Sequence, residues 1–372
     1  MVRSQNVNDY VEMGKDYIGK KHDVDSLYIY QPEPRFSFAL TGKAQQVGFF
    51  SYANFNLNFF DQLILPSESV SYLGERIYKK VGFEVGYGGL SFGYDVEVGR
   101  KDSHKRRALS FGMQNLKWGA RISYYTLQNT IISSMTIGEP GNLIYDSIEL
   151  SDRFGKMRNL SLDGYYVFKH RKFAYTATNN VSVIQRRTNG SFMLATRFMW
   201  ADLDTKEDMT GLFEAYSTVQ FSVGGGYSAN FVLWNRDAVN NDDRTVRNIT
   251  YNITLLPVIS LVNYMQTRAY ETVINLEDDT ETQTMKKSDI WCYPKPNLMG
   301  STAISFTWGH VYFNTMFTLN WFYFSSTDAI NSGKFDAPAI QIEGYDGDVI
   351  QDLRIHGVLY NWTLTAKVVY RF

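Results

Sequence analysis

The sequence predicts an all-β fold, a transmembrane antiparallel up-and-down β-barrel with an even number of strands, 12 to 14, after a short N-terminal amphipathic helix. Three observations favour this fold. Apolar and polar residues alternate with a period of two along most of the chain, aromatic residues make up 16% of it, and short connections alternate with long polar ones. Dyad alternation in segments near ten residues, with turns of unequal length, is typical of barrels that cross a membrane.

The alternation is clearest in the final segment, where every second residue from Trp362 to Phe372 is apolar and the residues between are mostly polar. Successive side chains of a strand point to opposite faces, so this segment has one apolar face that ends in aromatic residues. The same pattern predicts further strands, at about 36–58, 81–87, 90–98, 106–114, 116–124, 160–168, 172–184, 190–203, 213–235, 245–266, 298–308 and 310–324.

The connections between these strands differ in length. Four are tight, at 88–89, 114–115, 170–171 and 309–310, whereas the long polar ones are at about 60–77, 129–156, 267–296 and 325–352. Strand number must be even if both chain ends lie on one side. Closing the sheet leaves no unpaired backbone group facing lipid.

A soluble β-sandwich or a lipocalin-like barrel would also alternate. A dozen strands of this size would usually divide into domains, and no linker or shift in composition marks a boundary. No apolar run approaches the roughly 18 residues of a spanning helix. A mean hydropathy of -0.28 still suits a membrane barrel, because only every second strand residue faces lipid.

Localisation in the bacterial outer membrane follows from this fold, although Met1–Asn6 contains no apolar signal-peptide core. One explanation is a mature chain whose signal peptide was removed and replaced by a start methionine. The other is a soluble cytosolic protein. The barrel pattern favours the first.

Two regions are predicted: a periplasmic extension over 1–34 and the barrel over 35–372. Apolar residues at helical spacing between Val7 and Ile18 indicate a short amphipathic helix in the extension. This helix could plug the lumen, lie on the inner leaflet or dock a partner. Its mixed charge favours a packed extension.

Composition excludes several functions. With 37 Lys and Arg against 38 Asp and Glu, the chain lacks the basic excess of a nucleic-acid-binding protein. The single Cys292 excludes an internal disulfide and a cysteine-built zinc site. Acidic loops at 277–281 and 240–244 lack the spacing of a calcium loop, so we expect neither a metal nor another cofactor.

Charged residues occupy the polar face of several predicted strands. A charge facing lipid at the middle of the bilayer would cost about 2–4 kcal/mol, so these side chains are expected to face the lumen. They could select solutes in a conducting pore. Ion pairs that fill a narrow, closed lumen are the favoured alternative, because opposite charges occur on neighbouring strands. The predicted lumen-facing charges are Glu84, Asp95, Glu97, Lys117, Arg121, Asp163, Arg197, Lys367 and Arg371.

An enzyme is the least favoured interpretation. A barrel phospholipase or protease would need Ser, His and Asn, or paired acids with His, at one height of the barrel. The five histidines lie at positions 22, 104, 170, 310 and 356, and no such set accompanies them. No catalytic residue is therefore predicted.

Several segments resemble a Bacteroidota family of outer-membrane barrels of unknown function, domain of unknown function 4421. The residues that carry the resemblance are Gly164–Tyr175, Gln185–Ser191, Gly224–Asn230 and Leu255–Pro257. The sequence departs from the family pattern at Thr188–Asn189 and near Ala229. The family offers no catalytic or binding residues to carry over, so the resemblance implies only the fold and the membrane.

The chain end also resembles the signal that the outer-membrane assembly machinery reads. Its residues are Trp362, Leu364, Val368, Tyr370 and Phe372. We therefore expect a non-enzymatic barrel that is an accessory or structural subunit of an envelope complex or a small-solute channel. Its expected partners are outer-membrane lipids, the assembly machinery and such a complex, and a barrel enzyme is the alternative.

Overall fold

A computed structural model describes most of the chain. It covers residues 23–32, 36–59, 63–73, 77–99, 107–129, 131–137, 145–149, 155–180, 182–205, 215–237, 243–275, 280–325, 340–342 and 350–372. The amphipathic helix predicted between Val7 and Ile18 lies outside these residues.

Strands dominate the described residues. They are β1 (Ile29–Tyr30), β2 (Ser37–Phe59), β3 (Leu63–Leu73), β4 (Tyr78–Tyr87), β5 (Leu90–Glu97), β6 (Arg107–Gln114), β7 (Trp118–Asn129), β8 (Ile131–Ile137), β9 (Tyr145–Glu149), β10 (Gly155–Val167), β11 (Ile184–Gln185), β12 (Asn189–Thr205), β13 (Ala215–Arg236), β14 (Arg247–Asn275), β15 (Thr280–Trp291), β16 (Lys295–Trp308), β17 (Val311–Ser325), β18 (Ile340–Ile342) and β19 (Ile350–Arg371). Helix α2 (Thr176–Asn179) and the 3-10 turn η1 (Asp243–Thr245) complete the set.

Within the described ranges, twelve strands form one closed antiparallel barrel, which confirms the predicted fold class and even strand number. Around the ring their order is β2, β4, β5, β6, β7, β10, β12, β13, β14, β16, β17 and β19. Pairing of β19 with β2, for example Tyr370 opposite Phe38, closes the ring. Closure removes the unpaired edges that an open sheet would expose.

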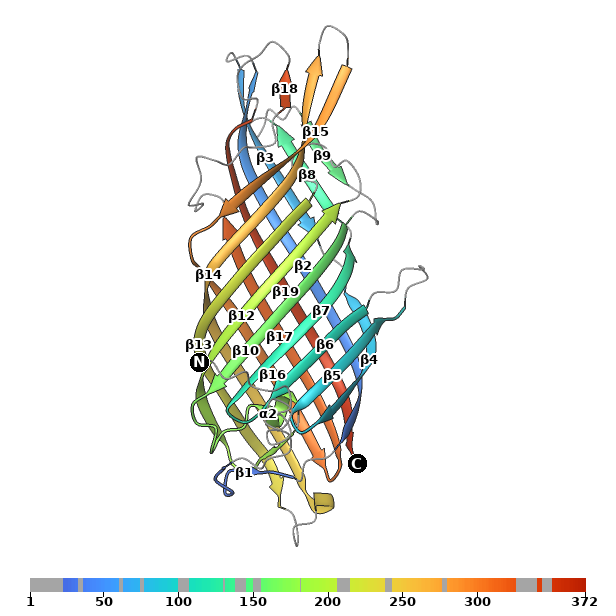
Figure 1. Ribbon diagram of the computed structural model, residues 1–372, viewed down its shortest axis with the longest axis vertical. Coiled ribbons are helices and arrows are strands. Elements are labelled where there is room, and N and C mark those ends of the chain that lie inside the picture. The colour runs from blue at the N-terminus through green and yellow to red at the C-terminus, as the bar shows by residue number, and fades with distance from the viewer. Residues whose placement is uncertain are drawn as a thin grey trace, which may run out of the picture.

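The two ends of the barrel differ (Figure 1). At one end, which we call the plug end, lie α2, β1, the C-terminus and the tight turns at 88–89, 115–117 and 309–310. At the opposite loop end, β3 pairs with the outer half of β2, and β15 pairs with the outer half of β14. Strands therefore occupy much of 60–77 and 267–296, which the sequence predicted as loops.

One predicted strand is wrong. The segment 172–184 contains turns and α2 instead of a strand. Residues 170–171 do form a tight turn, closed by the hydrogen bond from Lys172 N–H to the carbonyl of Lys169, but it leads into this connection instead of joining two strands. The chain from β10 to β12 folds into the mouth of the barrel, where Phe173, Ala174 and Ala177 are buried. Their apolar character reflects packing inside the lumen rather than the alternation of a strand, because a strand pattern and a short buried loop look alike in apolar content.

The barrel wall exposes apolar side chains outwards and polar ones inwards. Leu40, Phe192 and Leu233 are each more than 60% exposed, whereas Asn230, Asn252 and other polar side chains are fully buried on the lumen side. A soluble protein buries the opposite set. The outer face is therefore adapted to an apolar surrounding, and the packed interior of this molecule is its lumen.

Candidate functional site

The plug consists of residues 23–32, 168–180 and 182–188. Its two parts are joined by β1 pairing with β11, so the segment before the barrel and the β10–β12 connection fold together. Their shared apolar core consists of Ile29, Ala174, Ala177 and Val183, and it packs against Leu116 of the β6–β7 turn. The plug closes the barrel at the end where the chain also terminates (Figure 1).

Gln185 is the centre of the plug's hydrogen bonding. Its buried side chain donates through Nε2 to the carbonyl of Lys172 at 2.8 Å and accepts through Oε1 from the backbone N–H of Ala174 at 2.9 Å. The same nitrogen also reaches the carbonyl of Tyr28 at 3.3 Å. One side chain thus satisfies backbone groups from both parts of the plug, which burial would otherwise leave unpaired.

Barrel side chains hold the plug from the wall. Asn314 Nδ2 donates to the carbonyl of Thr178 at 2.6 Å, and Asn230 Nδ2 donates to the carbonyl of Ala174 at 2.8 Å. The Tyr175 ring packs edge-on against Tyr165. Burial raises the pKa of the Tyr175 hydroxyl, because desolvation penalises the phenolate, so this group stays neutral.

A second obstruction crosses the lumen nearer the loop end. Inward-pointing apolar residues from seven strands pack into one buried cluster, which we call the apolar layer. Its members are Val47, Tyr78, Tyr125, Met157, Met199, Ala201, Phe322 and Leu359. Each is at most 8% exposed, so these side chains pack against one another across the lumen.

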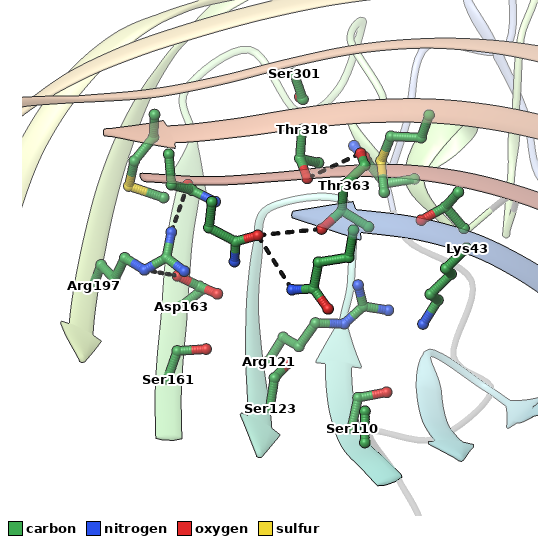
Figure 2. A pocket seen from close by; sticks show the side chains of 18 of the residues that line it. Lys43, Ser110, Arg121, Ser123, Ser161, Asp163, Arg197, Ser301, Thr318 and Thr363 are labelled. Atoms are coloured by element: carbon green, nitrogen blue, oxygen red, sulfur yellow. Dashed lines mark hydrogen bonds and ion pairs between the residues drawn. The ribbon is translucent and has the colours of Figure 1, made fainter. Parts of the chain in front are cut away.

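A cavity of about 280 Å³ lies between the plug and the apolar layer. Tyr175 and Asn179 of the plug line it at one side, and Tyr125 of the apolar layer lines it at another. The wall between carries charged and hydroxyl side chains, several of which point into the space (Figure 2). This cavity is the candidate functional site.

Most of the predicted lumen charges lie inside the barrel. Asp95, Glu97, Arg197, Lys367 and Arg371 are buried, and Glu84, Arg121 and Asp163 are partly buried. Arg371 lies over the ring of Tyr312 at 4.6 Å, close to the plug end. Of these residues, Asp95, Arg121, Asp163 and Arg197 line the cavity.

The prediction for Lys117 has to be corrected. Lys117 belongs to the turn before β7, is exposed, and lies over the ring of Tyr166 at 5.6 Å. Asn115 causes the change of direction, because its Oδ1 accepts hydrogen bonds from the backbone N–H groups of Lys117 and Trp118. This side-chain turn interrupts the alternation one residue before the strand begins.

Ion pairs join charges from different strands. Lys43 Nζ lies 2.6 Å from Asp95 Oδ2, and Thr41 donates to the other oxygen of Asp95. Arg197 Nε lies 3.2 Å from Asp163 Oδ1, as Figure 2 shows. The sequence did not identify Lys43, although its place on the polar face of β2 was readable from the alternation.

The interior charges also include one shared carboxylate. Glu84 faces two cations, with Arg121 Nη2 at 3.7 Å and Lys367 Nζ at 3.7 Å. The Nε of Arg121 is buried and has no hydrogen-bond partner within the described residues. Arg197 Nε also lacks a hydrogen-bond partner, but Arg197 donates through Nη1 to Asn320 and lies nearer to its carboxylate, as Lys43 does. Arg121 is therefore less completely paired than either.

The sequence offered plugging of the lumen as one possible role of the N-terminal helix, but it identified neither the β10–β12 part of the plug nor the apolar layer. One signal for the plug was present: Asn179 and Asn180 are adjacent, and strands disfavour asparagine. The apolar layer has no local signal, because its members come one or two at a time from separate strands.

The two histidines whose side chains are described both lie at the plug end. His310 lies in the β16–β17 turn, where its ring contacts Tyr370, and His170 lies in the plug segment. Within the described ranges, no three His, Cys, Asp or Glu side chains gather closely enough to bind a metal ion. No α-helix in the described part of the chain has the length and apolar character needed to cross a membrane.

Comparison with known families decides the classification. The family described as Domain of unknown function (DUF4421) matches residues 76–340, well over half of the chain. The chain belongs to this family. The DUF4421 match extends from the start of β4 to β18, so it includes the β10–β12 part of the plug and most of the cavity wall.

Two further comparisons complete the description. The sequence has no match among curated proteins. Among solved structures, the crystal structure of the P. putida toluene transporter TodX is similar over 91% of this DUF4421 chain and 90% of that chain, with 8% sequence identity and a TM-score of 0.25.

Proposed function

We propose that the protein is a non-enzymatic barrel of the bacterial outer membrane. The exposed apolar side chains around the closed wall support this location, since a spanning barrel needs an apolar outer band and no open edge. Outer-membrane lipids would then cover this band. The assembly machinery would recognise the outward aromatic face of β19 during insertion.

Within that membrane, the protein acts as a closed accessory or structural subunit of an envelope complex. One observation carries this proposal: the lumen is obstructed twice, by the plug and by the apolar layer. An open pore needs a continuous water-filled path, which two packed layers interrupt. The plug also presents a folded surface at the barrel mouth, where a partner could bind.

Single-channel recording in planar bilayers tests the closed state. The purified barrel is expected to produce no conductance steps in a broad range of salts and voltages. Large, spontaneous steps from the wild-type barrel would contradict the proposal. Purification from the native membrane in a gentle detergent tests the complex, and elution of the barrel alone as a monodisperse species would contradict it.

Small-solute conduction is the second candidate, and the cavity between the two obstructions favours it. In this case the plug or the apolar layer would have to move. Conductance steps that appear only after a solute is added would favour small-solute conduction over the closed subunit. A barrel enzyme has less support, and the wild-type protein is expected to release no fatty acid from phospholipid vesicles.

A further inference from the structure

Among the charged groups that line the cavity, taken together with the charges beside them on the neighbouring strands, cations outnumber carboxylates by one. Lys43 pairs with Asp95, Arg197 pairs with Asp163, and Lys80 lies opposite Glu97 on the neighbouring strand. Arg121 and Lys367, by contrast, share Glu84. Five cations therefore face four carboxylates, and the excess lies at this shared carboxylate.

The excess charge reaches the cavity through Arg121. Lys367 is 6% exposed and is not part of the cavity wall, whereas Arg121 lines the cavity. In Figure 2, Arg121 lies between the Arg197–Asp163 pair and Lys43. Its buried Nε lacks a hydrogen-bond partner within the described residues. A guanidinium with donors left over binds carboxylate or phosphate oxygens well.

The rest of the wall is rich in hydroxyl groups, which both donate and accept hydrogen bonds. Among these residues are Ser110, Ser123, Ser161, Ser301, Thr318, Thr363 and Thr365. A volume of about 280 Å³ is near the lower limit of ligand pockets, roughly 300–1,000 Å³. The wall therefore suits one small molecule that carries several hydroxyl groups.

We propose that the cavity is a binding site for a small, hydroxyl-rich monoanion, such as a sugar acid, whose negative group binds Arg121. One negative charge balances the single excess cation, and the ring of hydroxyl groups binds the sugar hydroxyls. The site is separate from the proposed closed-subunit function, because binding is an equilibrium property that needs no conduction.

The test is isothermal titration calorimetry of the full-length barrel in detergent with galacturonate. Galactose serves as the neutral probe of the same shape, and acetate as an anion without hydroxyls. Galacturonate is expected to bind at least about tenfold more tightly than either, because only it uses both features of the wall. Arg121→Gln is expected to weaken galacturonate binding about tenfold or more, while Glu84 keeps Lys367 as its partner.

Arg268→Gln is the matched control. Arg268 also pairs with a carboxylate, Asp202 at 2.8 Å, but it is not part of the cavity wall. Its replacement is expected to leave galacturonate affinity unchanged. Phe322→Ala removes a large side chain from the apolar layer. Galacturonate is expected still to bind this variant, and to enter and leave the cavity faster than in the wild type.

Three results would overturn the proposal. They are equal affinity for galactose and galacturonate, unchanged affinity in Arg121→Gln, and absence of galacturonate binding in both the wild type and Phe322→Ala. None of them bears on the closed state, which the bilayer recordings test separately.

Discussion

At the residue scale, Gln185 does most to fix the plug in place. Its side chain contacts backbone groups of Tyr28, Lys172, Ala174 and Arg187, so it links the segment before the barrel to the β10–β12 connection. No alternating pattern requires a glutamine there. Its importance arises because a buried irregular segment has many polar groups that only a side chain can satisfy.

Gln185→Ala is predicted to loosen the plug without opening the barrel wall. Leaving the N–H of Ala174 and the carbonyl of Lys172 unpaired should cost about 1–3 kcal/mol of local stability. Hydrogen exchange of amides in 168–188 should therefore accelerate, while exchange in β12 and β13 stays slow.

Gln266→Ala is the control for this prediction. Gln266 also forms a side-chain hydrogen bond, to Asp289 at 2.9 Å, but it lies on the outer part of β14. The Gln266→Ala variant should leave amide hydrogen exchange in the plug unchanged. Equal protection of 168–188 in Gln185→Ala and the wild type would show that Gln185 does not hold the plug.

At the element scale, the sequence predicted both the strand register and the turn position of the β4–β5 hairpin. Gly88 and Gly89 have φ of 57° and 93°, the left-handed conformation that a two-residue hairpin turn requires and that glycine adopts without strain. The structure adds a tertiary reason for Gly89. A Cβ there would lie 2.3 Å from the carbonyl oxygen of Gln114 on the next hairpin.

Gly89→Ala is predicted to destabilise the barrel more than Gly99→Ala. Gly99 also has a positive φ, 86°, but a Cβ there would meet nothing within 4 Å, so its replacement costs only the backbone strain, about 1–2 kcal/mol. Gly89→Ala adds the clash with Gln114. Urea unfolding of the detergent-solubilised barrel measures the difference, and equal midpoints for the two variants would contradict it.

The segment 172–184 shows where element prediction fails. Strand assignment relies on a local period, and this period is reliable only where both faces of the sheet have different surroundings. In the plug every side of Phe173 and Ala177 meets protein, so alternation carries no information there. The prediction for Lys117 failed for a related reason. The turn formed by the Asn115 side chain places Lys117 before the strand, where the inward and outward alternation does not apply.

At the scale of the whole molecule, the ring depends on the two strands that are farthest apart in the sequence. β19 pairs with β2 from Ile350 to Arg371, and the backbone N–H of Phe372 donates to the carbonyl of Phe36. The rings of Phe36 and Phe372 lie 5.9 Å apart. The last residue thus belongs to the closing seam and also to the outward aromatic face.

Phe372→Ser is predicted to reduce the amount of assembled barrel in the membrane severalfold, because it removes the terminal aromatic of the proposed assembly signal. Phe192→Ser is a matched control, since Phe192 is 65% exposed and Phe372 is 61% exposed on the same outer surface. Heat-modifiable migration on gels measures the folded fraction. An equal loss in both variants would indicate a general requirement for outward aromatics instead of a terminal signal.

The sequence by itself determined the all-β fold, the even strand number and the inward or outward direction of most strand residues. These follow from a period of two, which is local and is imposed by a wall with different surroundings on its two faces. Most of the charges on that inward face could be named as well, although Lys117 was placed wrongly and Lys43 and Lys80 were missed.

Only the tertiary structure decided what fills the lumen. The closed ring brings Glu84, Arg121 and Lys367 together from three strands, and it gathers the apolar layer from seven. Which inward residues meet depends on the stagger of the closed ring, a property of all twelve strands together. For this reason the plug, the apolar layer and the charged cavity between them could not be read from any single segment.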